Sequence, residues 1–210
     1  MKSIAMALAL LGALAMPSSA ETPAEGTYSA QLFDQLHPND RVLAGDWEQG
    51  LAKLIDTLAE TSDDPETLEN LDDFRALVDH RTLPFAISEL EGDWQVRSLQ
   101  AQDLGAFTYS YFPARVYPEG EALVFDKNSG SQRHRGMMAQ YDENTAFFVG
   151  ALYYGYEAPR LYSAIMAGES VTEAQREFDA VAEIYKTGDQ TFLMAFAPQN
   201  GGYRFYEMRR

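Results

Sequence analysis

The chain has 210 residues, and its 32 acidic side chains outnumber 16 lysines and arginines to give a formal net charge of −16. This charge repels phosphate backbones and anionic lipid, which makes nucleic acids and membrane surfaces poor partners. The chain contains no cysteine. Disulfides, thiolate metal sites and cysteine nucleophiles are therefore excluded.

Residues 1–20 have the pattern of a secretory signal peptide. Lys2 supplies the positive end, Ile4 to Met16 form a short apolar run, and Ser18, Ser19 and Ala20 are small residues at the expected cleavage point. The apolar run is shorter than the roughly 20 residues that a spanning helix needs. We expect a bacterial periplasmic protein with no membrane span after cleavage and a mature chain that starts at Glu21. An uncleaved anchor is the alternative.

Residues 21–82 predict a leader followed by two helices. Residues 21–38 are interpreted as a flexible leader, and residues 39–82 as a helical hairpin. Asn39 and Asp40 can cap the first helix, whose apolar stripe runs from Val42 to Leu58 at three- and four-residue steps. Asp64 before Pro65 is the expected cap of the second helix.

From residue 90 to residue 210 the apolar period changes to two, which is typical of strands. Polar turns separate the expected strands, and Gly130 in one of them can take a positive φ. The segment 158–178 is less regular, with a strand over 160–166 and a loop or short helix over 168–178 as options. Eight or nine short strands predict an antiparallel sandwich or barrel, and closure into a barrel removes exposed edges. The expected fold class is α+β, mainly β.

Gly92 and Trp94 begin the first expected strand, and Arg204 lies in the last. This arrangement resembles the calycin (lipocalin) pattern, in which an arginine of the final strand stacks on a tryptophan at the barrel bottom. The resemblance implies a calycin-like barrel with structural roles for these three residues. The alternative is an ordinary core tryptophan that follows a glycine.

The central stretch from Tyr117 to Gly155 carries a second resemblance. Its residues are Tyr117, Glu119, Gly120, Leu123, Phe125, Lys127, the run Gly130 to Arg133, Gly136, Phe148, Gly150, Ala151 and Gly155. They are similar in order to an exported bacterial family called domain of unknown function 4893. The resemblance spans about 46–210 and implies a signal peptide, an N-terminal helical segment and a β-rich remainder. It implies no activity.

Arg133, His134 and Arg135 form the one basic cluster of the acidic sequence. They are candidates to dock an anionic group or an acidic partner. Alternatively, the two arginines pair with carboxylates of the chain itself. Ser131 lacks a Gly-x-Ser-x-Gly setting, and the three histidines lack metal-ligand spacing. We therefore expect no catalytic residue, no metal and no cofactor.

Aromatic residues alternate along the expected strands. Tyr109, Tyr111, Phe147, Tyr153 and Phe196 are the candidates to line a cavity inside the barrel. The alternative is that aromatic rings fill the small barrel completely.

These patterns favour a non-catalytic periplasmic binding or accessory protein with a small apolar ligand inside the barrel. One alternative is a protein-binding module, similar to periplasmic protease inhibitors of that architecture and acting on an envelope protein. The other is a hydrolase-type enzyme, which would need His134, Arg133 and a carboxylate to line one pocket.

Overall fold

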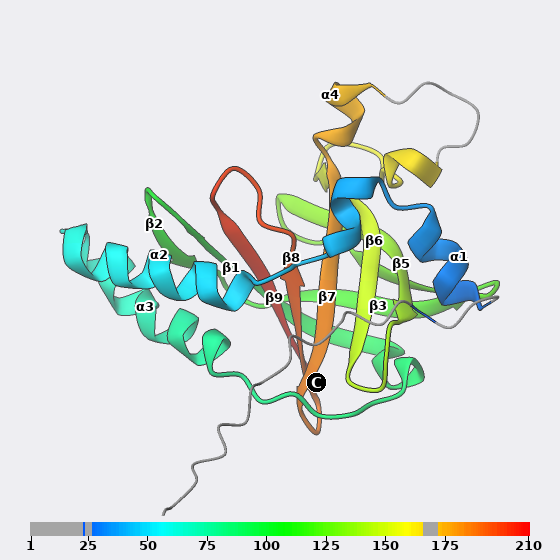
Figure 1. Cartoon of the computed structure of the whole chain (residues 1–210), viewed down its shortest axis with the longest axis horizontal. Coiled ribbons are helices and arrows are strands. Elements are labelled where there is room, and N and C mark those ends of the chain that lie inside the picture. Colours follow the sequence, from blue (N-terminus) through cyan, green and yellow to red (C-terminus); the bar gives the residue numbers. More distant parts are fainter. Residues whose placement is uncertain (1–22, 24–26, 166–171) are drawn as a thin grey trace, which may run out of the picture.

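The chain forms a closed β-barrel flanked by helices on its outer face (Figure 1). The computed structural model describes residue 23, residues 27–165 and residues 172–210. The predicted signal peptide lies outside the described residues. No helix among those described is both long and apolar enough to cross a bilayer.

Within the described ranges, nine antiparallel strands make up the sheet. They are β1 (Gly92–Gln102), β2 (Gly105–Thr108), β3 (Phe112–Glu119), β4 (Ala122–Lys127), β5 (Gln132–Gln140), β6 (Thr145–Tyr154), β7 (Asp179–Gly188), β8 (Thr191–Phe196) and β9 (Tyr203–Arg209). Strands β3 to β9 follow one another in order, and β1 pairs with both β3 and β9. This pairing closes an eight-stranded barrel and leaves β2 outside it, as an extra strand beside β1. The predicted mainly-β class and closed barrel are confirmed.

Strand β1 has two neighbours on one of its edges. Its first half, Gly92 to Val96, pairs with β3, whereas its second half, Leu99 to Gln102, pairs with β2. The barrel wall therefore has no β1–β3 ladder beyond Val96. The missing part of the ladder leaves an opening in the side of the barrel.

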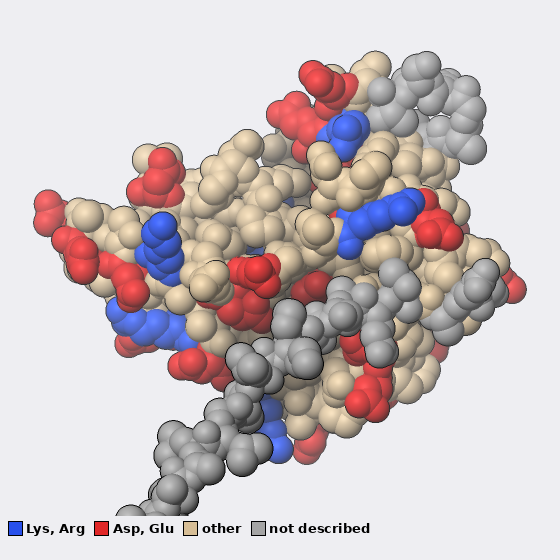
Figure 2. Space-filling view, in the orientation of Figure 1, with Lys and Arg blue, Asp and Glu red and all other residues tan. Residues whose placement is uncertain are grey.

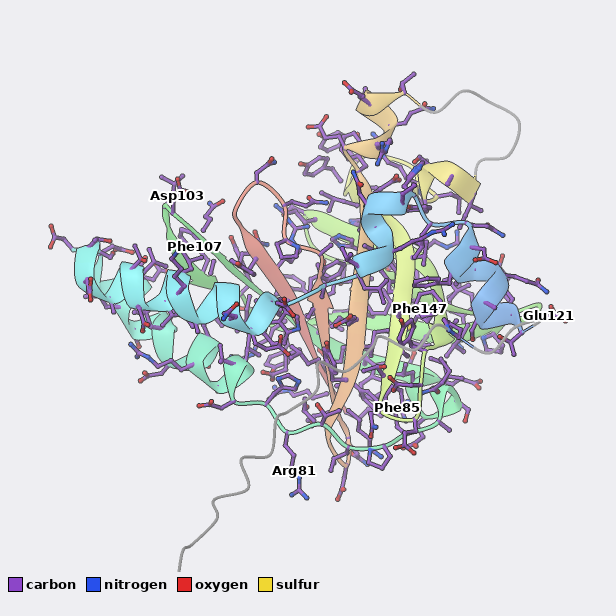
Figure 3. All side chains as sticks on the ribbon, viewed as in Figure 1. Arg81, Phe85, Asp103, Phe107, Glu121 and Phe147 are labelled. Atoms are coloured by element: carbon purple, nitrogen blue, oxygen red, sulfur yellow. The ribbon has the colours of Figure 1, made fainter. Side chains whose placement is uncertain are left out.

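Side chains inside the barrel form one apolar cluster that includes Trp94, Phe125, Phe148, Phe192 and Met208. The 3₁₀ helix η2 (Ile87–Leu90) covers one end of this cluster with the buried Leu90. Phe85 packs edge-on against Phe192 at the same end, which is the lower end in Figure 3. We call this the sealed end of the barrel.

Two groups of helices cover the outer face of the barrel. Helices α2 (Trp47–Thr61) and α3 (Pro65–Val78) form the predicted hairpin and pack on Leu99, Leu193 and Phe205. On another side, α1 (Tyr28–Asp34) packs its buried Phe33 against Phe147 of β6, at 5.9 Å between ring centroids (Figure 3). The barrel is therefore buried on both faces over much of its circumference.

The structure differs from the sequence-based expectation in three segments. Residues 28–34 of the predicted flexible leader form α1, because Leu32 and Phe33 find an apolar surface on the barrel. The helix expected from Asn39 is a short 3₁₀ helix, η1 (Pro38–Val42), and α2 starts only at Trp47, after Gly45 with φ +60°.

The third difference concerns 158–178. Residues 163–165 form the 3₁₀ helix η3 (Ser163–Ile165) instead of a strand. The short helix α4 (Glu173–Arg176) follows a Thr172 cap, as one of the two options for 168–178 allowed. Residues 166–171 lie outside the described residues.

Candidate binding site at the open end of the barrel

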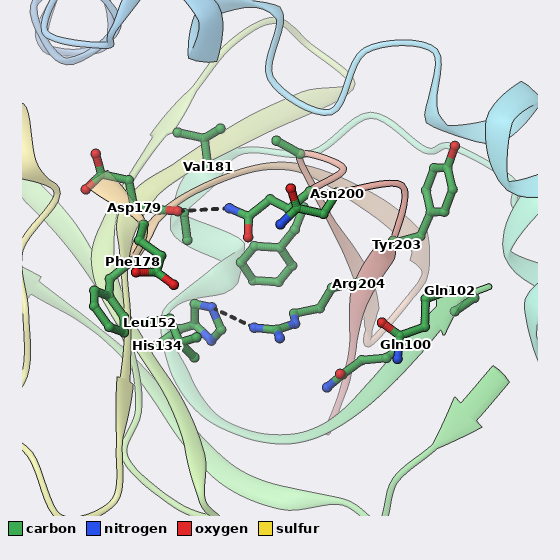
Figure 4. Close-up of a pocket in the computed structure, with 17 residues that line it drawn as sticks. Gln100, Gln102, His134, Leu152, Phe178, Asp179, Val181, Asn200, Tyr203 and Arg204 are labelled. Atoms are coloured by element: carbon green, nitrogen blue, oxygen red, sulfur yellow. Dashed lines mark hydrogen bonds between the residues drawn. The ribbon is translucent and has the colours of Figure 1, made fainter. Parts of the chain in front are cut away.

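A cavity of about 230 Å³ occupies the end of the barrel opposite the sealed end (Figure 4). Its wall comes from β1, β5, β6, β7, β8, β9 and the turn before β9. The side chains around it include Gln100, His134, Leu152, Phe178, Phe196 and Arg204. We call this the mouth cavity. Its lining combines apolar side chains with the basic Arg204 on its floor and the carboxylates of Glu177 and Asp179.

His134 is the deepest titratable group of the floor, with 1% of its surface exposed. Its Nδ1 lies 2.7 Å from the Tyr206 hydroxyl, and its Nε2 lies 3.5 Å from Nη1 of Arg204 (Figure 4). A guanidinium can only donate, so Nε2 accepts and Nδ1 carries the proton. Burial is the main cause that holds the pKa of His134 well below its usual range, and the charges of Arg204 and Lys127 make smaller contributions. The imidazole is therefore neutral.

Lys127 lies beside His134 in the β4–β5 ladder and is only 4% exposed. Its Nζ donates to the carbonyl oxygens of Ser129, at 2.9 Å, and Gln132, at 3.1 Å. The ammonium also lies 5.5 Å from the ring centroid of Tyr206. Burial, with smaller contributions from neighbouring arginines, lowers the pKa of Lys127 to about 8. The side chain is thus mostly charged at neutral pH.

A second cavity of about 170 Å³ opens through the side of the barrel, where β1 is no longer paired with β3. Lys127, Tyr109 and Tyr206 line it, and it shares Gln100 with the mouth cavity. Gln100 donates from Nε2 to Oε1 of Gln132 at 3.2 Å, which links β1 to β5 across this gap. Lys127 and Arg204 are thus approached from two adjoining cavities.

Ser163, His37 and Asp179 meet beside the mouth cavity, a grouping that sequence reasoning missed. Nε2 of His37 lies 3.0 Å from the Ser163 hydroxyl and 3.6 Å from a carboxylate oxygen of Asp179. The Ser163 hydroxyl donates to Asp179. In a catalytic triad the acid bonds the ring nitrogen that faces away from the serine. Here the serine and the acid face the same nitrogen, so the grouping fastens η1 and η3 to β7.

A comparison with protein-family models matches residues 34–199 to a domain of unknown function (DUF4893). The chain belongs to this family. No curated protein and no solved structure matches the DUF4893 chain. The described residues of this DUF4893 protein hold no group of three or more histidine, cysteine or acidic side chains placed to bind a metal.

The predicted stacking of Arg204 on Trp94 is wrong. Trp94 does lie at the sealed end, where its indole donates to the carbonyl of Leu90 at 2.7 Å. The cation over its ring is Arg210, just after β9, at 4.1 Å from the ring centroid. Arg204 lies at the other end of the same strand, in the floor of the mouth cavity. Gly92, with φ +128°, begins β1 beside Arg210.

Of the aromatic set expected inside the barrel, Phe196 alone belongs to the interior cluster. Phe147 belongs to the outer cluster that contacts α1, and Tyr153 pairs with Arg133 on the outer face. Tyr111 bonds Glu207 on the outside of the barrel. Tyr109 is 47% exposed and lines the side opening. For Tyr109 and Tyr111 the expectation failed because β2 ends at Thr108 and β3 starts a new alternation at Phe112. For Phe147 and Tyr153 it failed because β6 turns Phe148 to the interior, which leaves its odd-numbered neighbours on the outer face.

The basic run Arg133 to Arg135 lies in β5 and not in a turn, so its members face opposite sides of the sheet. His134 points inward, as described. Arg135 pairs with Glu119 at 3.2 Å, and Nε of Arg133 donates to the carbonyl of Gly130 at 2.9 Å. Gly130 has the predicted positive φ, +76°.

Lys127 was not among the candidate site residues that the sequence predicted. Strand β4 continues through this residue, and the alternation Leu123, Phe125, Lys127 brings its side chain to the inner face. The alternation could have indicated from the sequence that Lys127 faces the interior of the barrel.

Proposed function

We propose that this DUF4893 protein is an exported, non-catalytic binding protein that holds a small molecule at the open end of its barrel. The observation that carries the proposal is the asymmetry of the barrel. One end is sealed by Trp94, Leu90 and Arg210, whereas the other holds the mouth cavity of about 230 Å³. Barrel mouths with a few convergent polar groups are common ligand sites.

The ligand that fits this cavity is not purely apolar. The interior towards the sealed end is filled by buried side chains such as Phe125, Phe148 and Met194. What remains open is bordered by His134, Arg204 and Gln100. A ligand that displaced water from these groups would have to replace their hydrogen bonds, since an unpaired buried donor costs about 1–3 kcal/mol. The proposed ligand therefore carries a polar group.

Native mass spectrometry of the mature protein, isolated from its own compartment without detergent, tests the proposal. We expect an added mass that disappears on denaturation. A bare polypeptide mass, together with no binding of any small molecule at the mouth, would contradict the proposal and direct attention to protein partners.

The geometry of Ser163 supports the non-catalytic part of the proposal over the hydrolase alternative. Its hydroxyl is buried and directed at Asp179, and His37 lacks an acid on its outer nitrogen among the described contacts. We expect a fluorophosphonate probe to leave the protein unlabelled. Labelling that vanished in Ser163→Ala would establish a nucleophile and refute this part.

The contacts of Arg133 and Arg135 support the small-ligand proposal over a protein-binding module. Arg135 already has Glu119 as a partner, and Arg133 is half-buried and bonded to the backbone. Docking through these two side chains would therefore first break contacts within the chain. Pull-downs with Arg135→Gln test this alternative, and we expect the variant to capture the same proteins as the wild type.

Export remains part of the proposal on the ground of residues 1–20. Their charged start, apolar run and small residues have the pattern that a signal peptidase reads. Cell fractionation followed by N-terminal sequencing should find a periplasmic chain that begins at Glu21. A cytoplasmic chain that retains Lys2 would contradict it.

A further inference from the structure

Two basic side chains near the open end of the barrel have no carboxylate partner: Arg204 lines the mouth cavity, and Lys127 lines the adjoining side cavity. Lys127 is 4% exposed and bonded only to backbone carbonyls. Arg204 is half-buried, and it donates to the neutral ring of His134. Among the described residues, neither forms an ion pair. Buried charges are otherwise paired or bound to metals.

Most other partly buried basic side chains of the described residues do have a carboxylate partner. Among the other partly buried basic side chains, Arg97 has Glu207, Arg135 has Glu119 and Lys186 has Glu89, whereas Arg133 donates to the carbonyl of Gly130. The chain has twice as many acidic as basic residues, 32 against 16. Arg204 thus lines the mouth cavity without an ion-pair partner, and the buried Lys127 lines the adjoining side cavity, so a negatively charged ligand would meet an unpaired cation there.

We propose that the mouth cavity binds a small organic acid, whose carboxylate pairs with Arg204 in the field of Lys127. The inference rests on the proposed function and names its ligand class. A guanidinium presents parallel N–H donors that match the two oxygens of a carboxylate. Leu152, Phe178 and Phe196 line the same cavity and offer an apolar surface to the rest of the molecule.

The cavity also limits the size and charge of the acid. Its volume of about 230 Å³ corresponds to roughly eight non-hydrogen atoms at the roughly 30 Å³ that each water molecule takes in the liquid. Glu177 and Asp179 line the same cavity and disfavour a second negative charge on the ligand. His134 is neutral and adds no third cation. A monocarboxylate of the size of hexanoate or benzoate fits both the volume of the cavity and its preference for a single negative charge.

Isothermal titration calorimetry of the mature chain with hexanoate and benzoate tests the inference. Hexanol and benzamide serve as neutral analogues of the same shape. We expect both acids to bind at least about tenfold more tightly than their analogues, since a hydrogen bond to a charged group contributes about 1.5–3 kcal/mol. Inorganic phosphate that bound as tightly as hexanoate would overturn the assignment to a monocarboxylate.

Variants locate the carboxylate. Arg204→Gln removes the charge and should weaken benzoate binding at least about tenfold, whereas binding of benzamide should not change. Arg115→Gln is the matched control, because the Arg115 side chain is 70% exposed on β3 outside the cavity. If Arg204→Gln does not fold, Arg204→Lys is the second variant. It keeps the positive charge but lacks the parallel N–H donors of the guanidinium, and it should still weaken benzoate binding. Unchanged benzoate affinity in a folded Arg204 variant would refute the assignment.

The experiment separates failure of the inference from failure of the proposed function. If the neutral analogues bind as well as the acids and Arg204→Gln has no effect, the inference that the ligand is an organic acid is wrong. The proposal of a ligand site at the mouth would still stand. A wild-type protein that binds neither acids nor analogues, and that carries no added mass in native mass spectrometry, would overturn both.

Discussion

Lys127 is held in the barrel at a cost in folding free energy. Its ammonium loses water, receives two carbonyl oxygens in return and has no carboxylate within ion-pair distance among the described residues. The lowered pKa of this group, about 8 against 10.5 for an ordinary lysine, expresses the same cost, because the folded state disfavours the charged form. A residue that weakens the fold and faces a cavity is a candidate for a functional role.

Replacing Lys127 with methionine should stabilise the protein and impair ligand binding. Methionine has a similar length and needs no partner, so we expect a gain of about 2 kcal/mol in the free energy of unfolding at about pH 7. The unfolded state holds the lysine proton up to a higher pH than the folded state does. Wild-type stability therefore rises as pH increases from about 8 towards 10.5.

Urea unfolding of the wild type and Lys127→Met at increasing pH provides the measurement. The advantage of the variant should shrink across that window. Binding of benzoate, measured in parallel, should weaken. A variant that is less stable than the wild type at neutral pH would show that the ammonium contributes to folding, contrary to this argument.

Glu183 on β7 should make stability fall with rising pH. Burial raises its pKa to about 7 from 4.5, and the nearby Glu48 and Asp142 add to the rise while the hydrogen bond from Tyr185 opposes it. Between these values the folded state binds more protons than the unfolded state, so stability decreases as pH rises through about 4.5 to 7.

The change to test is Glu183→Gln, followed by urea unfolding at about pH 5 and about pH 8. The wild type should lose about 2–3 kcal/mol relative to the variant between these conditions. Glu60→Gln, at an exposed position of α2, should keep the wild-type dependence. Parallel pH profiles for the wild type and Glu183→Gln would contradict the expectation.

Strands β5 and β6 approach each other closely at a pair of glycines. Gly136 and Gly150 face each other in the ladder, and a Cβ on either would overlap the backbone of the paired strand and the ring of Phe148. We expect Gly150→Ala to destabilise the fold by about 2–3 kcal/mol, because the buried ring and the paired strand must both shift. Gly202→Ala is the control, since its nearest contact would be an ordinary 3.4 Å.

Thermal unfolding followed by circular dichroism measures both variants. A small change for Gly150→Ala, equal to that of the control, would mean that β5 and β6 can separate at this point without loss.

Local patterns predicted most elements of this fold. Asp64 caps α3 as expected and accepts a hydrogen bond from the Thr67 amide at 2.9 Å. The alternation of apolar residues likewise located most of the strands. It did not predict where β2 ends and β3 begins, because both have aromatic residues at period two. Nor did it predict α1, whose seven residues depend on a barrel surface formed far along the chain.

The candidate site was less predictable for the same physical reason. Lys127, His134 and Arg204 come from β4, β5 and β9, and only the closure of the barrel brings them together. Sequence reasoning selected His134 for a surface role and Arg204 for a role at the sealed end. No local pattern reports which end of a barrel a residue will occupy, since that depends on strand register.

At the scale of the whole molecule, the acidic charge and the basic floor are separated. Figure 2 shows acidic side chains over the hairpin and around α4, with basic side chains interspersed among them. The cations without carboxylates lie inside the barrel instead. A high net negative charge favours solubility, and cations enclosed by the barrel are accessible to the proposed small ligand and not to a large anionic partner.

The helical hairpin and the barrel should unfold together. Trp47 of α2 is 1% exposed and packs on Phe205 of β9, with 4.9 Å between ring centroids. Arg97 of β1 also bridges Asp73 of α3 and Glu207 of β9, at 3.3 and 2.9 Å. Separation of the hairpin would expose the outer face of the strands that close the barrel.

We therefore expect Trp47→Ala to cost about 3–5 kcal/mol and to shift the whole transition. Far-ultraviolet circular dichroism, which follows the helices, and near-ultraviolet signals of the barrel tyrosines should change at the same temperature. Calorimetry should give one transition whose enthalpy equals the van't Hoff value. If the helical signal of Trp47→Ala melted first and left the barrel signal unchanged, the hairpin would be a separate unit that only rests on the barrel.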